Sequence, residues 1–267
     1  MIRPVKTLIA ALAAMAILPG MVVAEGALER LSTSDQGRGW EAVGRLNFDD
    51  SGFCTAALIT TDVVLTAAHC LFDPADGSPI DPASIEFQAG LRLGRAEAYR
   101  GIKRVVVHPE YVFDAAGGAR LDGVGVDLAL LELNRPVRQG NIRPFPTQLR
   151  VEAGQRVQVV SYGRDRAEAP SRESACNVLA RDAEIMVLSC EVDFGSSGAP
   201  VFAVHEGEAR IVSVISAMGQ WEGQDVSLAA VMEGQLETLI AEFAMTPVFA
   251  PVGKRITVRD ALATAAR

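Results

Sequence analysis

Short apolar or alternating runs recur between turn-forming residues along nearly the whole chain. Before a polar, proline-containing stretch at 141–148 they occupy residues 42–48, 55–59, 63–66, 84–87, 102–107 and 128–133, and after it residues 156–161, 185–189, 201–204, 210–216 and 227–232. Runs of this length and pattern are typical of strands that are buried on one or both faces. The sequence therefore predicts an all-β protein with a division near residue 145.

Only residues 233–244 show a helical pattern, with Leu236, Leu239, Ile240 and Phe243 on one face. We expect this helix to pack its apolar stripe on a barrel. The glycine-rich segment 112–126 lacks the following helix that a phosphate-binding loop requires, so we predict a surface loop. The polar segment 162–174 is predicted to be an exposed, mobile loop. Residues 245–267 form a C-terminal tail.

The N-terminus has the features of an export signal. Arg3 and Lys6 precede an apolar run at 8–18, and the small-residue site Val22-Val23-Ala24 follows. The run is shorter than the roughly 20 residues that span a bilayer, so we expect a cleaved signal peptide (1–24) and no stable membrane anchor. Cleavage near Ala24 would place the protein outside the cell or in the periplasm, with residues 25–39 as an N-terminal segment or short propeptide.

The charge of the chain excludes some partners. Its formal net charge is −8, which becomes −10 when Arg3 and Lys6 leave with the signal peptide, and it has no basic cluster. An acidic chain of this kind does not favour nucleic acid or anionic membranes as partners. Nothing in the sequence demands a cofactor or a metal, since the spacing of Asp114 and Asp122 matches no calcium loop. Oligomeric state leaves no mark in the sequence.

Four cysteines are expected to form disulfides, because an exported protein meets an oxidising compartment. Three pairings are possible. We expect Cys54–Cys70 and Cys176–Cys190, which close short loops and contribute up to about 3 kcal/mol each. A zinc site of Cys54, His69 and Cys70 is the rival interpretation. It is disfavoured because an adjacent His and Cys do not easily aim both side chains at one metal.

Three short motifs carry residues suited to nucleophilic chemistry. His69 ends a buried strand in "VVLTAAHCL", where Cys70 would hold its backbone in place, as a general base requires. Asp127 stands at the mouth of the apolar strand in "GVDLALLEL", and a histidine N–H is one partner that would offset its burial. Ser196 and Ser197 lie between glycines in "DFGSSGAPV". Each motif taken singly also fits a structural role, such as a turn or a cap.

Taken together and in this order, the motifs resemble those of the chymotrypsin-like (trypsin-like) serine endopeptidases, from about residue 40 to 243. The resemblance implies two six-stranded antiparallel β-barrels, at 40–145 and at 146–244 with the C-terminal helix, and an active site between them. It assigns His69, Asp127 and Ser197 to a catalytic triad that hydrolyses protein or peptide substrates through an acyl-enzyme. Ser197 is the nucleophile because it is the third residue of the pattern G-x-S-G-x-P.

The resemblance implies further site residues. The N–H groups of Gly195 and Ser197 would form the oxyanion hole. Ser216 falls where family members place a serine beside the triad and the substrate backbone. Glu191 falls where trypsin has the aspartate at the base of its specificity pocket, although it fits a solvated loop charge better. Ala217 and Met218 stand where many relatives have Trp and Gly.

Two other functions fit the sequence less well. An α/β-hydrolase is disfavoured because Ala199 occupies the last position of its G-x-S-x-G motif and because His69 precedes the serine. A catalytically silent binding protein on the chymotrypsin fold is the alternative from a different class. Silent relatives usually lose a triad residue, whereas this chain retains all three.

The chain also departs from trypsin. Ser196 stands where trypsin has an aspartate that pairs with a new amino terminus, and the segment before Trp40 lacks the I-V-G-G start. Bacterial relatives similar to glutamyl endopeptidases also carry an uncharged residue there. We therefore expect an exported bacterial-type member whose oxyanion loop is ordered by neutral hydrogen bonds.

Overall fold

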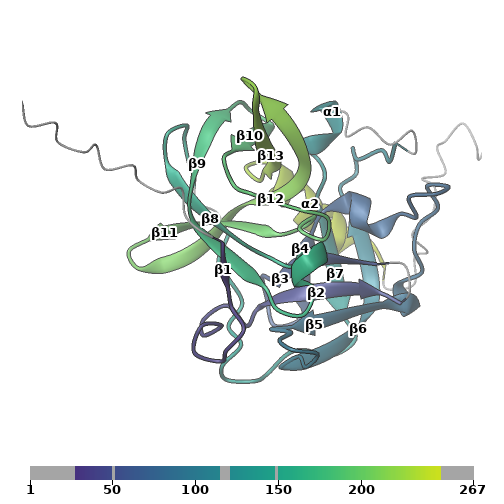
Figure 1. Ribbon diagram of the computed structural model, residues 1–267. Helices are drawn as coiled ribbons and strands as arrows, with labels where there is room; N and C mark the ends of the chain where they lie inside the picture. Colours follow the sequence, from purple (N-terminus) through teal and green to yellow (C-terminus); the bar gives the residue numbers. More distant parts are fainter. Residues whose placement is uncertain (1–27, 50–51, 115–120, 148–149, 248–267) are drawn as a thin grey trace, which may run out of the picture.

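The computed structural model describes residues 28–49, 52–114, 121–147 and 150–247 (Figure 1). The predicted signal peptide (1–24) and nearly all of the predicted tail (245–267) lie outside the described residues. Strands dominate, as the sequence predicts. Within the described ranges, no helix is long and apolar enough to cross a membrane.

The first six main strands form a closed antiparallel barrel in the order β2-β3-β4-β7-β6-β5. The strands are β2 (Val43–Phe48), β3 (Phe53–Leu58), β4 (Val63–Thr66), β5 (Ile85–Ala89), β6 (Ala98–Val107) and β7 (Ala129–Leu133). Pairing of β5 with β2 closes the barrel, with Leu46 opposite Phe87. Both side chains are fully buried in the core.

The second barrel is built from six strands in the order β9-β10-β13-β12-β11-β8 and is closed by pairing of β8 with β9. The strands are β8 (Arg156–Ser161), β9 (Ser171–Arg181), β10 (Ile185–Leu188), β11 (Pro200–His205), β12 (Glu208–Trp221) and β13 (Gln224–Val231). Small β-branched residues such as Val159, Val178 and Val201 fill its interior. The fold class is therefore the predicted pair of six-stranded barrels.

A short strand from the N-terminal segment joins the second barrel. β1 (Glu29–Arg30) pairs with β9, and the N–H of Leu31 donates to the carbonyl of Pro170 at 2.8 Å. The Leu31 side chain is fully buried. Cleavage just before Trp40 would therefore remove a strand and a buried side chain from the fold.

A shared aromatic cluster joins the two barrels. The Trp40 ring lies 5.0 Å from the Phe202 ring and 5.9 Å from the Phe145 ring, and Phe145 and Phe202 are 4.6 Å apart, all between centroids. These residues belong to or pack against a core that runs from the first barrel into the second. Edge and tilted contacts of this kind stabilise the interface beyond their buried area.

Helices are few and short among the described residues. α2 (Gln235–Met245) packs Leu236 and Leu239 into the core of the first barrel, beside β6 and β7. It begins two residues later than predicted because Gly234, with φ of 77°, is its N-cap. The other turns are α1 (Leu121–Val124) and the 3₁₀ turns η1 (Ala68–Leu71), η2 (Pro82–Ser84) and η3 (Arg164–Arg166).

Two loop predictions need correction. Segment 162–174 is not an exposed, mobile loop, because Tyr162 is fully buried, donates its hydroxyl to the Leu91 carbonyl at 3.0 Å, and β9 begins at Ser171. The prediction took the polar residues of this segment as a sign of exposure, but one of them, Glu173, is buried. Segment 112–126 is not wholly a surface loop, since Val124 is buried against Val187 and Leu228 of the second barrel.

Candidate active site

A cleft of about 900 Å³ opens between the two barrels. The first barrel contributes His69 and Phe53 to its walls, and the second contributes Gly195, Ser197 and Ser216. Four of the residues that the sequence nominated for catalysis and substrate binding therefore share one cleft.

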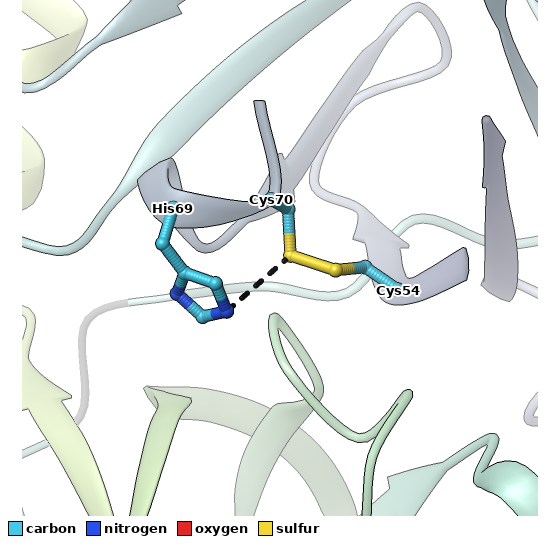
Figure 2. Close-up of side chains that lie close together, drawn as sticks. All are labelled: Cys54, His69 and Cys70. Carbon is cyan, nitrogen blue, oxygen red and sulfur yellow. Dashed lines mark hydrogen bonds between the residues drawn. A yellow bond between two sulfur atoms is a disulfide. The ribbon is translucent and has the colours of Figure 1, made fainter. Parts of the chain in front are cut away.

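His69 lies in η1, the short 3₁₀ turn that comes directly after β4. The neighbouring Cys70 forms a disulfide with Cys54 of β3, so this turn is covalently tied to the next strand of the barrel. Figure 2 shows the His69 ring beside this disulfide, with Nε2 3.9 Å from Cys70 Sγ. Because Ala68 and Cys70 are buried, the backbone on both sides of His69 is fixed.

Asp127 holds His69 at two points. Its Oδ1 accepts the backbone N–H of His69 at 2.8 Å, and its Oδ2 lies 2.7 Å from Nδ1 of the ring. Oδ2 also accepts the hydroxyl of Ser216 at 2.5 Å. An ionised carboxylate only accepts hydrogen bonds, so Nδ1 carries the proton and the neutral ring leaves Nε2 as an acceptor.

The surroundings of His69 change its basicity. Burial by itself lowers the pKa of His69, but the charge of Asp127 and the hydrogen bond to it outweigh this effect and raise the pKa above the ordinary value. The His69 side chain keeps 30% of its surface exposed, whereas that of Asp127 keeps 4%. His69 is therefore a base of raised strength that still reaches the cleft.

Cys54, His69 and Cys70 also form the one group of potential metal ligands found in the described part of the chain. Their ligand atoms lie within 4.8 Å of one another. Both sulfurs are bonded to each other in the disulfide, and zinc binds cysteine as the free thiolate. The donor set therefore does not fit the zinc site that rivalled the disulfide interpretation.

We call residues 193–198, between β10 and β11, the oxyanion loop. Thr55 of β3 fixes two of its carbonyl groups: the Thr55 hydroxyl donates to Gly195 O at 2.8 Å, and the Thr55 N–H donates to Ser197 O at 2.8 Å. No acceptor among the described residues takes the N–H of Gly195 or Ser197, whereas Ser196 N–H donates to Asp193 O. The two N–H groups are thus available to a ligand in the cleft.

Glycine is required at two positions of this loop. Gly195 has φ of 95°, and a Cβ there would lie 2.3 Å from the Phe53 ring. Gly198 has φ of 77°, and a Cβ there would lie 2.0 Å from Thr66 Oγ1 and 2.3 Å from Thr55 O. The glycines on both sides of the serines therefore let the second barrel's loop lie directly against the first barrel.

The two serines have different environments. Ser197 is partly exposed and lines the cleft, whereas Ser196 is fully buried. Ser196 Oγ accepts from the Arg166 guanidinium at 3.0 Å and lies 3.1 Å from the Tyr162 carbonyl, to which it can donate. Within the described residues, no hydrogen bond joins Ser197 Oγ to His69.

Neutral hydrogen bonds from Thr55 hold the oxyanion loop, as predicted. The contact of Arg166 with Ser196 adds a cationic donor that was not predicted. A serine hydroxyl accepts from a guanidinium as readily as from a neutral donor, and the bond is stronger when one partner is charged.

Comparison with known proteins agrees with this geometry. The sequence matches the family described as Trypsin over residues 32–224, which is most of the chain. The chain belongs to the trypsin family. Its architecture resembles that of a solved glutamyl endopeptidase ("Structure of Glu endopeptidase in complex with MPD"), with a TM-score of 0.66, 16% identity, and coverage of 81% of this chain and 97% of that one.

Curated members of the family share part of the sequence. The chain is 31% identical to human transmembrane protease serine 7 over 148 residues, which is 51% of this chain and 16% of that protein. It is also 31% identical to mouse transmembrane protease serine 11E over 98 residues, which is 37% of this chain and 20% of that protein. The chain therefore matches a fifth or less of the length of these relatives.

Residues proposed for specificity divide into two groups. Ser216, Ala217 and Met218 line the cleft, as does Asp193. Glu191 has an exposed side chain, is not among the residues that line the cleft, and donates its backbone N–H to Glu173 at 2.7 Å.

Sequence reasoning missed Thr55 and Arg166, whose side chains contact the oxyanion loop at Gly195 and Ser196. Thr55 lies inside the quoted family segment "CTAALITTDVVLTAAHC", but nothing in that string distinguishes its hydroxyl. Arg166 lies in the segment that was predicted to be an exposed loop. No signal in the sequence distinguishes this arginine from one in an exposed loop.

Proposed function

We propose that the protein is an exported serine endopeptidase that hydrolyses peptide bonds with His69, Asp127 and Ser197. The observation that carries the proposal is that His69, fixed by a 2.7 Å contact with Asp127, lines the same cleft as Ser197. Membership of the trypsin family supports it independently.

The proposed reaction begins when Ser197 Oγ attacks the carbonyl carbon of the scissile peptide bond. Nε2 of His69 takes the hydroxyl proton and then gives it to the departing amine, so the peptide C–N bond breaks and an acyl-enzyme forms. Water, activated by the same nitrogen, then hydrolyses the ester and releases the acid with Ser197 restored. Asp127 stabilises the imidazolium that forms between these transfers.

Negative charge develops on the carbonyl oxygen in each addition step. We infer that the N–H groups of Gly195 and Ser197 receive this charge, since no acceptor among the described residues takes them. Each such donor typically contributes about 2.7 to 4 kcal/mol to catalysis. The Thr55 contacts to both carbonyls support this role, because they fix the orientation of the peptide groups next to these donors.

Export is part of the proposal. Two disulfides, Cys54–Cys70 and Cys176–Cys190, form in compartments that are oxidising. Together with the signal-like segment 1–24, they favour a secreted or periplasmic protein that acts on protein or peptide substrates. The proposal keeps residues 25–39 as an N-terminal segment or short propeptide.

A fluorophosphonate probe tests the function. The disulfide-bonded, processed protein should react with the probe at a single serine, mapped by mass spectrometry to Ser197, and should cleave a denatured, fluorescently labelled protein. Labelling at Ser196 would refute the assignment of the nucleophile. Absence of both labelling and cleavage would refute the enzyme and favour the silent binding protein.

A further inference from the structure

A half-buried arginine contacts the oxyanion loop through Ser196. Arg166 ends the turn η3 and donates from one guanidinium nitrogen to Ser196 Oγ at 3.0 Å. Its other terminal nitrogen donates to Ser161 Oγ at 3.0 Å and to the Ser161 carbonyl. The guanidinium therefore ties the loop to the end of β8.

The protein is shaped to hold this side chain. A Cβ at Gly163 would lie 2.8 to 3.0 Å from three atoms of the Arg166 guanidinium, so only glycine lets the group lie against the backbone there. Ser161 and Ser196, its two hydroxyl partners, are buried at 1% and 0% exposure. Burial lowers the pKa of Arg166, and the nearby carboxylates of Asp193, Glu191 and Glu173 oppose this effect. An arginine keeps its charge under such conditions.

Ser196 transmits this contact to the catalytic backbone. Its Oγ also accepts the N–H of Asp193 at 3.3 Å and lies 3.1 Å from the Tyr162 carbonyl, so it is held from three directions. Gly195 and Ser197, its two neighbours in sequence, carry the two N–H groups that no described acceptor takes. Rotation of Ser196 would turn both peptide groups, and the adjacent glycines offer little resistance of their own.

We propose that Arg166 is a positioning residue that holds the oxyanion loop in its active conformation through Ser196. This inference rests on the proposed function. The Arg166 guanidinium anchors the loop without the two groups that trypsin uses, which are a carboxylate just before the nucleophile and a buried amino terminus. Thr55 holds the same loop from the other barrel, so the loop is fixed between the two contacts.

The test compares Arg166→Met, Arg166→Lys, Ser196→Ala and the double variant Arg166→Met/Ser196→Ala with the wild type. Arg210→Met is the matched control, because Arg210 forms an ion pair with Glu208 at the far end of the β11–β12 hairpin. Fluorophosphonate titration gives the active fraction, so kcat and KM refer to folded, reactive protein. The affinity for a peptide aldehyde reports on the oxyanion hole, because its adduct with the serine is tetrahedral.

We expect Arg166→Met to lower kcat about 100-fold, as loss of one oxyanion donor does, and to weaken aldehyde binding by a similar factor with KM nearly unchanged. Arg166→Lys should recover part of the loss. Adding Ser196→Ala to Arg166→Met should cost little more, because both act through one contact. Arg210→Met should match the wild type.

Three results would overturn the inference: wild-type kcat in Arg166→Met, a loss confined to KM or to the active fraction, or fully additive effects in the double variant.

Hydrogen exchange of the 190–200 peptide separates this inference from the proposed function, because it needs no catalysis. Faster exchange in Arg166→Met than in Arg210→Met supports the anchor even if the protein hydrolyses nothing. Equal exchange in these two variants contradicts it.

Discussion

The two halves of the candidate site are held in different ways. In the first barrel, His69 is fixed by its spatial neighbours: the Cys54–Cys70 disulfide, buried residues in η1, and Asp127, which accepts two hydrogen bonds from it. In the second barrel, the oxyanion loop is held mainly by side chains from elsewhere, Thr55 and Arg166. His69 is thus held within its own barrel by a disulfide and a buried carboxylate, whereas the oxyanion loop depends on polar contacts with Thr55 of the first barrel and with Arg166.

His69 is therefore held in one orientation, whereas the conformation of the oxyanion loop is set by hydrogen bonds that can adjust. The base must keep one orientation throughout the reaction, and a covalent link with a buried carboxylate provides it. The loop carries N–H groups that must meet a charge only when it develops, and its glycines leave the backbone free to be set by hydrogen bonds.

Removing the nucleophile should have the largest effect. Ser197→Ala should lower kcat by about 10⁶-fold, as loss of the serine does in another serine protease, without lowering the melting temperature. Ser174→Ala, at an exposed position of β9, is the matched control and should retain wild-type kcat. Retention of activity in Ser197→Ala would place the nucleophile elsewhere.

Asp127→Asn should lower kcat by roughly 10⁴-fold, because the amide favours the wrong tautomer of His69. In the wild type, kcat/KM should rise with pH as His69 loses its proton, with a midpoint above 6.5, the ordinary pKa of histidine. The midpoint should fall in Asp127→Asn, since the charge that raises this pKa is gone. An unchanged midpoint would show that Asp127 does not set the basicity of His69.

The same pair makes stability depend on pH. Because the folded pKa of His69 lies above 6.5, protonation of the pair stabilises the protein fully below that pH, and the contribution is lost as pH rises through the folded pKa. Melting curves of the wild type and Asp127→Asn across this range measure the difference. A wild-type advantage that grows with rising pH would contradict the sign.

The two disulfides should differ in what they support. Replacing Cys54 and Cys70 by Ala, or Cys176 and Cys190 by Ala, should destabilise the protein by up to about 3 kcal/mol in each case, since the loops are of similar length. Below both melting temperatures, only the first replacement should lower kcat, by roughly 10-fold to 100-fold, because it releases the turn that carries His69. Equal losses of kcat would remove the distinction between the two halves.

Thr55→Val should have the smallest effect. The substitution keeps the shape and removes a hydroxyl that donates to Gly195 O and accepts the N–H of Tyr162 at 3.0 Å. Loss of hydrogen bonds worth about 1 kcal/mol each should lower kcat by roughly tenfold, with KM nearly unchanged. Thr238→Val, in the exposed first turn of α2, is the control. A change in KM alone would indicate that Thr55 contacts substrate instead of supporting the loop.

The fold was largely predictable because its strands carry local signals. β4 and β8 begin and end where the sequence predicts, and the other predicted strands differ only at their ends. β9 was missed because its first buried positions are Ser171 and Glu173, which lie among charged residues. Burial of polar groups follows from the partners they meet in three dimensions, and a strand's own sequence does not carry that information.

The site residues, like the strands, could be predicted only where the signal is local in the sequence. His69, Asp127 and the glycines around Ser197 could be nominated because they lie in short motifs with a fixed spacing. Thr55 and Arg166 could not, because their roles arise from contacts across 140 and 30 positions of the chain. No local pattern distinguishes such an arginine from one on a solvated surface.

A crystal structure with a bound peptide boronic acid tests the assignment of Ser197 and of the two N–H donors. We expect a covalent bond from Ser197 Oγ to boron, one boronate oxygen within hydrogen-bond distance of both Gly195 N and Ser197 N, and Arg166 still bound to Ser196. Attachment to another residue, or a boronate oxygen that meets neither N–H group, would contradict this assignment.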